Sequence, residues 1–118
     1  MSTNMGPNKM YIDGEWVSAS DGKTLDIINP ANEEAVDTVP LATTADLDRA
    51  LAAADRAWKT WREVDAWSRS AALRRTADLI RERAGAIAEV LTQEQGKTLP
   101  EAKGETLAAA DQFDWYAD

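Results

Sequence analysis

The hydrophobic pattern in the first third of the chain is that of short β-strands. Two apolar or aromatic runs surround the pair Asp13-Gly14, which predicts a β-hairpin because both turn residues tolerate positive φ. Two alternating segments follow at residues 24–28 and 35–39. We therefore predict a small antiparallel meander over residues 10–42.

From Thr43 onward the hydrophobic period becomes helical. Thr43 or Thr44 can cap the helix start, and Asp46 lies where the helix dipole favours negative charge. The apolar residues then recur at spacings of four and three, which places them on one stripe of a helix of about five turns. They are Leu47, Leu51, Ala54, Trp58 and Trp61. A stripe with two tryptophans needs a partner surface.

A second helical region follows, which Asp65 can cap. A glycine in a helix interior costs about 1 kcal/mol relative to alanine. We therefore predict either two helices that meet at Gly85 or one helix with a bend there. The inward positions before and after the glycine are Leu73, Ala77, Ile80, Ile87, Val90 and Leu91.

The tripeptide Gly96-Lys97-Thr98 raises the question of a phosphate-binding loop. Such a loop needs a glycine five positions before Gly96, and that position is Leu91, on the apolar face of a helix. The loop is therefore excluded. Gly96 instead fits the left-handed residue that ends a helix, and Thr98 with Glu101 fits a capping box for the next one.

The last predicted helix runs to the final residue without a capping glycine, which is typical of an interrupted helix. Its predicted apolar face consists of Leu99, Ala102, Thr106, Ala109, Phe113 and Tyr116. Another face carries the smaller residues Gly104 and Ala108 together with Gln112. This second face can lie close to a neighbouring backbone or border a channel.

Composition and charge narrow the function classes. The 118 residues, 44% hydrophobic and 29% charged, have the balance of a single soluble globular domain. A net charge of −8, from 21 acidic and 13 basic residues, argues against a nucleic-acid partner. No apolar run reaches the roughly 18 residues of a membrane span, and no secretory signal is recognisable. We therefore predict a cytoplasmic protein without a membrane partner.

The chain contains no cysteine and no histidine. This excludes thiolate nucleophiles, histidine-based acid–base pairs and the common zinc sites. Carboxylates, lysines and tyrosines remain, but none lies in a recognisable catalytic spacing. We therefore predict that these residues include no catalytic residue of their own. The helical tryptophans are interpreted as packing residues rather than stacking platforms; they are Trp58, Trp61, Trp67 and Trp115.

Several short sequence segments (phrases, below) resemble, in their order and spacing, the N-terminal segment of the NAD(P)-dependent aldehyde dehydrogenase superfamily. They are YIDGEWV at 11–17, the INP of DIINP at 26–30, VPLAT at 39–43, LDRALAAADRAWKTWRE at 47–63, LTQEQGKTLPEAKGE at 91–105 and FDWYAD at 113–118. The last two phrases are most similar to the succinate-semialdehyde dehydrogenase branch.

The resemblance implies an α/β fold for the full-length protein, of which this segment supplies a small antiparallel β-meander and three to four α-helices. Composition and hydrophobic period divide the chain into a flexible tail at residues 1–9, the meander at 10–42 and a helical part at 43–118. The resemblance implies that this helical part belongs to an incomplete nucleotide-binding domain. It further implies NAD or NADP as the cofactor of the full-length enzyme, none for this piece alone. The implied partners are the remainder of the chain and further copies in a homo-oligomer.

Two groups of residues receive a role from the resemblance alone. Backbone carbonyls of Ile27 and Ile28, with the carboxylate of Glu94, are implied as ligands of an alkali cation, the alternative being that Glu94 is a surface carboxylate near a helix end. The face formed by Gly104, Ala108 and Gln112 is implied to border the substrate tunnel, the alternative being close helix packing.

Three functions remain open at this point. The chain is the N-terminal part of an aldehyde dehydrogenase, which oxidises an aldehyde, with succinate semialdehyde as a candidate, to the acid through a cysteine thioester. Alternatively, it is a stand-alone or self-associating helical interaction module without enzymatic activity. The third alternative is a truncated product without a function.

Overall fold

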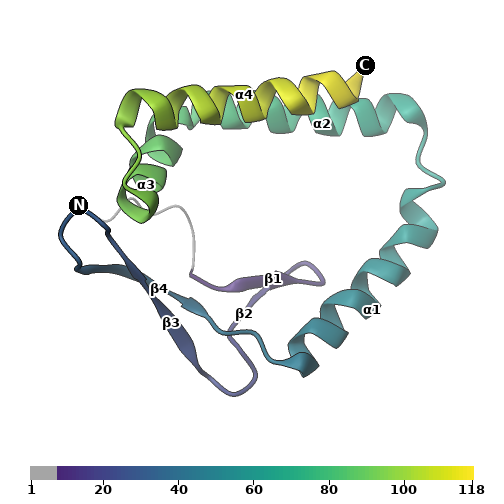
Figure 1. Ribbon diagram of the computed structural model, residues 1–118. Helices are drawn as coiled ribbons and strands as arrows, with labels where there is room; N and C mark the ends of the chain where they lie inside the picture. The colour runs from purple at the N-terminus through teal and green to yellow at the C-terminus, as the bar shows by residue number, and fades with distance from the viewer. Residues whose placement is uncertain (1–7) are drawn as a thin grey trace. The chain divides into compact units, whose positions relative to one another are not determined.

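The computed structural model describes residues 8–118 and divides them into two compact units. The hairpin unit comprises residues 8–28 and 34–63, and the helical unit comprises residues 29–33 and 64–118. The elements of each unit are labelled in Figure 1. Of the tail predicted at residues 1–9, residues 1–7 lie outside the described part.

The predicted first hairpin is confirmed. Strands β1 (Met10–Ile12) and β2 (Glu15–Val17) pair in antiparallel register around the turn. Asp13 and Gly14 have φ values of 56° and 83°, the left-handed conformation that a two-residue hairpin turn requires. Across the pair, the rings of Tyr11 and Trp16 lie 5.0 Å apart between centroids at an interplanar angle of 57°, a favourable tilted arrangement.

Strands β3 (Thr24–Ile28) and β4 (Ala35–Pro40) form a second antiparallel pair. Within the described residues, β2 does not pair with β3, so the meander consists of two separate hairpins. In the segment between β2 and β3, the backbone N–H and the hydroxyl of Ser20 both donate to the carboxylate of Asp46, at 3.1 and 3.2 Å. This segment is therefore tied to a helix rather than to a neighbouring strand.

Helix α1 (Thr44–Trp61) begins with the predicted cap at Thr43, which forms a reciprocal capping box with Asp46. The side chain of Asp46 is buried, with 1% of its surface exposed. It accepts bonds from the Thr43 backbone N–H at 3.0 Å and the Thr43 hydroxyl at 2.9 Å. These backbone bonds, from Thr43 first and then Ser20, lower the pKa of Asp46 to about 2, because they stabilise the charged carboxylate.

The helical unit consists of helices α2 (Ala66–Glu82), α3 (Ala84–Gln95) and α4 (Leu99–Ala117). Asp65 caps α2 as predicted, accepting from the Ser68 backbone N–H at 3.0 Å. The predicted break is confirmed, but the chain changes direction at Arg83, whose φ and ψ are −100° and 7°, two residues before Gly85. Of the arginines of α2, Arg74, Arg75 and Arg81 are exposed and Arg69 is half-buried.

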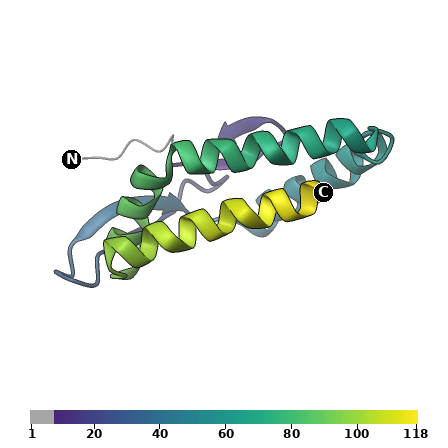
Figure 2. The ribbon, with the colours of Figure 1, turned by 90° about the horizontal axis from the view of Figure 1, so that it is seen from above.

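The core of the helical unit is built from small residues. Helices α2 and α4 lie side by side in Figures 1 and 2, and their contact is the most extensive in the unit. Small side chains allow two helix axes to approach closely. Ion pairs flank this contact, with Arg81 reaching Asp111 and Asp114 at 2.7 Å each. The most deeply buried residues are Ala77, Ala84, Ala88, Ala102 and Ala110.

The predicted apolar face of α4 is only partly correct. Ala102 and Thr106 are buried as predicted, but the face continues through Ala110 and Ala117. Phe113 and Tyr116 are instead exposed, at 36% and 75%. The close contact with α2 accommodates alanine but not an aromatic ring. The buried face of α4 is therefore rotated about the helix axis, away from the face predicted from the large apolar side chains.

Gly96 ends α3 in the predicted left-handed conformation, with φ 71° and ψ 9°. A Cβ at this position would lie 2.8 Å from Cγ of Pro30, so both the backbone and the neighbouring turn require glycine here. The predicted capping box of α4 does not form. The Thr98 hydroxyl makes no bond to a backbone N–H but donates to the Glu101 carboxylate at 2.7 Å, because a free hydroxyl and a charged acceptor meet directly.

We predict that Gly96→Ala lowers the free energy of unfolding by about 1–3 kcal/mol, through its positive φ and the approach of Pro30. Gly104→Ala is the matched control, because Gly104 lies in helix α4 with no atom within 4 Å of an added Cβ. It should raise the free energy of unfolding by about 0.5–1 kcal/mol. Urea unfolding followed by circular dichroism measures both, and equal effects of the two substitutions would contradict the role assigned to Gly96.

We predict a second effect, on the acid stability of the hairpin unit. The pKa of Asp46 is lowered from 3.8 to about 2 in the folded state. Its stabilisation is therefore complete above pH 4 and is lost as the pH falls towards 2. Asp46→Asn should remove this part of the acid dependence of the urea midpoint, whereas Asp48→Asn, at an exposed position of the same helical turn, should retain it. Identical pH profiles for Asp46→Asn and the unmodified chain would contradict this assignment.

Candidate functional site

The residues implied as cation ligands belong to different units. Ile27 and Ile28 lie on β3 of the hairpin unit, where the register shifts between them. Glu94 lies exposed in the last turn of α3, in the helical unit. Among residues 8–118, no group of three or more acidic side chains is placed to hold a metal ion. The alkali-cation site therefore remains a prediction from the resemblance.

The small-residue face of α4 is open within the helical unit. Gly104, Ala108 and Gln112 are all exposed, and an added Cβ at Gly104 would meet no atom within 4 Å. Each residue turns a helix by about 100°, which places Ala108 opposite the buried face centred between Thr106 and Ala110. Close helix packing at this face therefore does not occur within the helical unit, and its role as the border of a substrate tunnel stays a prediction.

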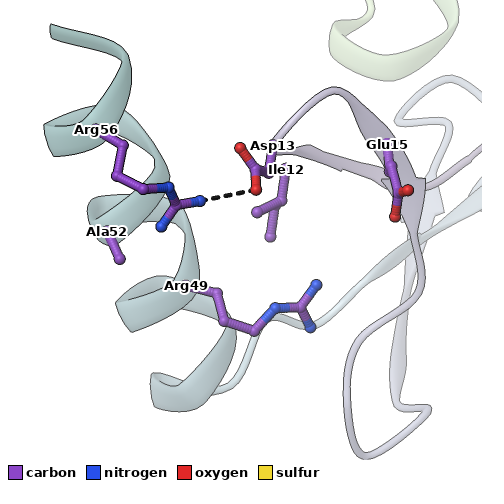
Figure 3. A pocket seen from close by; sticks show the side chains of 6 residues that line it. All are labelled: Ile12, Asp13, Glu15, Arg49, Ala52 and Arg56. Carbon is purple, nitrogen blue, oxygen red and sulfur yellow. Dashed lines mark hydrogen bonds and ion pairs between the residues drawn. The ribbon is translucent and has the colours of Figure 1, made fainter. Parts of the chain in front are cut away.

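A charged pocket lies in the hairpin unit between β1–β2 and α1, with a volume of about 290 Å³. Figure 3 shows the guanidinium of Arg56 reaching across it to the Asp13 carboxylate, 2.7 Å away. The guanidinium of Arg49 lies 3.5 Å from the buried carboxylate of Asp46. The lining residues are Ile12, Asp13, Glu15, Arg49, Ala52 and Arg56.

The chemistry of this pocket is that of an ion-pair cluster. Its two carboxylates, Asp13 and Glu15, balance the charge of its two guanidinium groups, and the Asp13 carboxylate is paired with Arg56. The cluster joins the tip of the first hairpin to α1. Sequence reasoning did not find it, because Asp13 and Arg56 are 43 residues apart; the available signal was the seven-residue spacing that places Arg49 and Arg56 on one helix face.

A second pocket, of about 250 Å³, lies among the three helices of the helical unit. Its polar side chains already have partners. The Thr106 hydroxyl donates to the Ala102 carbonyl at 2.8 Å, and the Glu105 carboxylate pairs with Lys97. The remaining lining residues are the apolar Ile80, Ile87, Leu91 and Ala109. This pocket therefore presents no arrangement for catalysis.

The described residues do not fit a nicotinamide dinucleotide. Such cofactors bind at the carboxyl ends of parallel strands, beside a glycine-rich turn that opens a helix. Both sheets of the described chain are antiparallel pairs, and Gly96 ends a helix instead of opening one.

The helical tryptophans also differ from their interpretation as packing residues. Trp58 and Trp61 on α1 are 59% and 46% exposed, and Trp67 on α2 and Trp115 on α4 are 86% and 76% exposed. Among residues 8–118, therefore, alanines and not these rings form the buried core of the helices. Within residues 8–118, no helix combines the length and the hydrophobicity that a membrane crossing needs.

The same fold occurs in solved dehydrogenases. Betaine aldehyde dehydrogenase from Staphylococcus aureus, in complex with NAD⁺, is similar with a TM-score of 0.93 and 37% identity, covering 98% of this chain and 23% of that one. An aldehyde dehydrogenase from Brucella melitensis is similar with a TM-score of 0.92 and 38% identity, covering 94% of this chain and 23% of that one. The predicted α/β fold class, of which this chain is one segment, is confirmed.

The sequence comparisons define the family. The model of the aldehyde dehydrogenase family matches residues 16–118, and the chain belongs to this family. It is 46% identical over 108 residues to the glutarate-semialdehyde dehydrogenase of Pseudomonas putida, covering 92% of this chain and 22% of the relative. It is 37% identical over 116 residues to an NADP⁺-type succinate-semialdehyde dehydrogenase of Escherichia coli, covering 98% of this chain and 24% of the relative.

These comparisons confirm the resemblance to the N-terminal segment of the superfamily and to its semialdehyde dehydrogenases. The chain spans 22% to 24% of the length of the two curated relatives. The residues of the two pockets therefore represent a minor part of such an enzyme, and the chemistry of a complete dehydrogenase cannot be built from them.

Proposed function

We propose that this chain forms the N-terminal part of an NAD(P)-dependent aldehyde dehydrogenase that oxidises a semialdehyde with a terminal carboxylate, such as succinate or glutarate semialdehyde. The observation that carries the proposal is the 46% identity over 108 residues to the Pseudomonas putida glutarate-semialdehyde dehydrogenase. The 37% identity to the Escherichia coli succinate-semialdehyde dehydrogenase supports the same substrate class.

The residues present indicate which functions this segment can and cannot contribute to the proposed enzyme. Oxidation through a thioester needs a thiolate nucleophile, and this chain has no cysteine. The antiparallel hairpins do not supply a dinucleotide site. The chain therefore contributes scaffold, while the nucleophile and the NAD(P) site belong to the remaining polypeptide. Assembly into a homo-oligomer and a cytoplasmic location are part of the same proposal.

The alternative, a self-associating helical module, is supported by the exposed apolar side chains of both units. Its charge opposes it, because two copies that each carry −8 repel one another. Light scattering of the isolated chain separates the two readings. A stable dimer with all four helical tryptophans protected from solvent would favour the module.

The direct test of the proposal is a chimera in which these residues replace the matching segment of the Pseudomonas putida relative. We expect the chimera to form NADH or NADPH from glutarate or succinate semialdehyde, and to turn over long aliphatic aldehydes more slowly. The unmodified relative is the control. A folded chimera without turnover of any aldehyde would contradict the proposed function, and a preference for aliphatic aldehydes would contradict the substrate class.

We further propose that the open face of α4 borders the path of the aldehyde. In the chimera, Ala108→Trp should raise the KM for the semialdehyde about tenfold and change kcat less, because a narrowed path weakens substrate binding. Lys59→Trp, at an exposed position of α1, serves as the control and should leave both constants unchanged. Unaltered kinetics in Ala108→Trp would remove this face from the substrate path.

A further inference from the structure

The hairpin unit contains both Asp-Gly pairs of the chain, Asp13-Gly14 and Asp21-Gly22. An aspartate followed by glycine is prone to cyclise, because glycine has no side chain to hinder its backbone nitrogen. An added Cβ at either glycine would meet no atom within 4 Å, so neither nitrogen is shielded by neighbouring residues. The two pairs differ in how firmly the reacting groups are held.

The reaction joins the backbone nitrogen of the glycine to the side-chain carbon Cγ of the aspartate. The new N–Cγ bond closes a succinimide ring, the Cγ–OH bond of the protonated carboxyl group breaks, and the hydroxyl leaves with the glycine N–H proton as water. A water molecule then opens the ring. Cleavage of the N–Cγ bond restores aspartate, whereas cleavage at the main-chain carbonyl gives isoaspartate, in which the backbone runs through the side-chain carbons.

Three interactions restrain the Asp21-Gly22 pair. The Gly22 N–H donates to the Ala19 carbonyl at 2.9 Å. One oxygen of the Asp21 carboxylate accepts from the Lys23 backbone N–H at 3.0 Å, and the other pairs with the Lys23 ammonium at 3.1 Å. The Lys23 N–H, and after it the Lys23 side chain, lower the pKa of Asp21, which disfavours the protonated carboxyl group that ring closure needs.

The Asp13-Gly14 pair is held less firmly. Among the described residues, the Asp13 carboxylate has one partner, the Arg56 guanidinium at 2.7 Å, and both side chains are largely exposed (Figure 3). An exposed ion pair of this kind is worth little in water. Asp13 also has a φ of 56°, a conformation that is strained for a residue with a Cβ. The sheet around it has only two strands, which are marginally stable by themselves.

We propose that Asp13-Gly14 is a site of spontaneous isoaspartate formation and that the ion pair with Arg56 slows the reaction there. Ring closure carries Cγ towards the Gly14 nitrogen, so the guanidinium must first be released. Isoaspartate lengthens the turn by one backbone atom. A two-residue turn with positive φ at both positions fits one backbone length, so the modified turn no longer supports the register that places Tyr11 opposite Trp16. This reaction is independent of the proposed dehydrogenase activity.

Incubation of the folded 118-residue chain in heavy-oxygen water measures the reaction, because each opening of the ring places one heavy oxygen atom in the product. Cleavage after Glu15 separates the two Asp-Gly pairs for mass spectrometry. Each labelling rate is divided by the rate of the same pair in guanidinium chloride, which removes the effect of the neighbouring sequence. We expect the normalised rate at Asp13 to be about fivefold that at Asp21, where more hydrogen bonds must break.

The role of the ion pair is tested by substitution. Arg56→Gln should raise the normalised rate at Asp13 about threefold, the size of effect expected for an exposed ion pair, and leave the rate at Asp21 unchanged. Arg62→Gln is the matched control, because it removes an exposed ion pair with Glu63 just after α1. It should change neither rate.

Equal normalised rates at the two Asp-Gly pairs, or a faster rate at Asp21, would overturn the proposal. An unchanged rate at Asp13 in Arg56→Gln would overturn the role of the ion pair. Asp13→Asn gives a second measurement, because it keeps an Asn-Gly turn that suits the hairpin and reaches the same ring by loss of ammonia. Isoaspartate should accumulate at this position faster than in the unmodified chain. Its absence would show that the folded turn prevents ring closure and would overturn the site.

Discussion

The close contact between helices α2 and α4 is the constraint on which the arrangement of the helical unit depends. It is made by alanines such as Ala77, Ala102 and Ala110, which are fully buried. Because these side chains are short, the two backbones approach closely and exclude larger residues from the interface. Every bulky side chain of α4 must then point elsewhere, which is why Phe113 and Tyr116 lie outside.

The hairpin unit is also packed through small side chains, but a buried carboxylate stabilises it in addition. Alanines of α1 face the first hairpin, and the buried carboxylate of Asp46 joins the helix start to the segment before β3. Its charge is stabilised by backbone N–H groups, which a neutral side chain of the same size would satisfy less well. Contacts of small residues and one buried charge thus stabilise the unit. The leucines and tryptophans of α1 remain exposed.

The features that sequence reasoning predicted correctly are those decided within a few residues. Asp13-Gly14, the cap at Thr43 and the left-handed Gly96 each follow from local backbone chemistry. The buried face of α4 was only half predicted, because the choice between Ala109 and Ala110 depends on how closely α2 approaches. For the same reason the sequence could not pair Asp13 with Arg56 in the charged pocket, since its hydrophobic period carries no information on which hairpin meets which helix.

The candidate site was less predictable than the fold, for a related reason. The resemblance assigns roles to Glu94 and to the Gly104 face, but neither the periodicity nor the spacing of the sequence points to those roles. A fold alone does not determine function, which depends on the residues of a particular site. When a site is built from several distant segments of a chain, one segment by itself contains only part of the structure that supports the site. The open faces of α1 and α4 are what such a scaffold presents. The side chains of these faces are too large or too small to fit the alanine contacts within their own units, so they remain exposed.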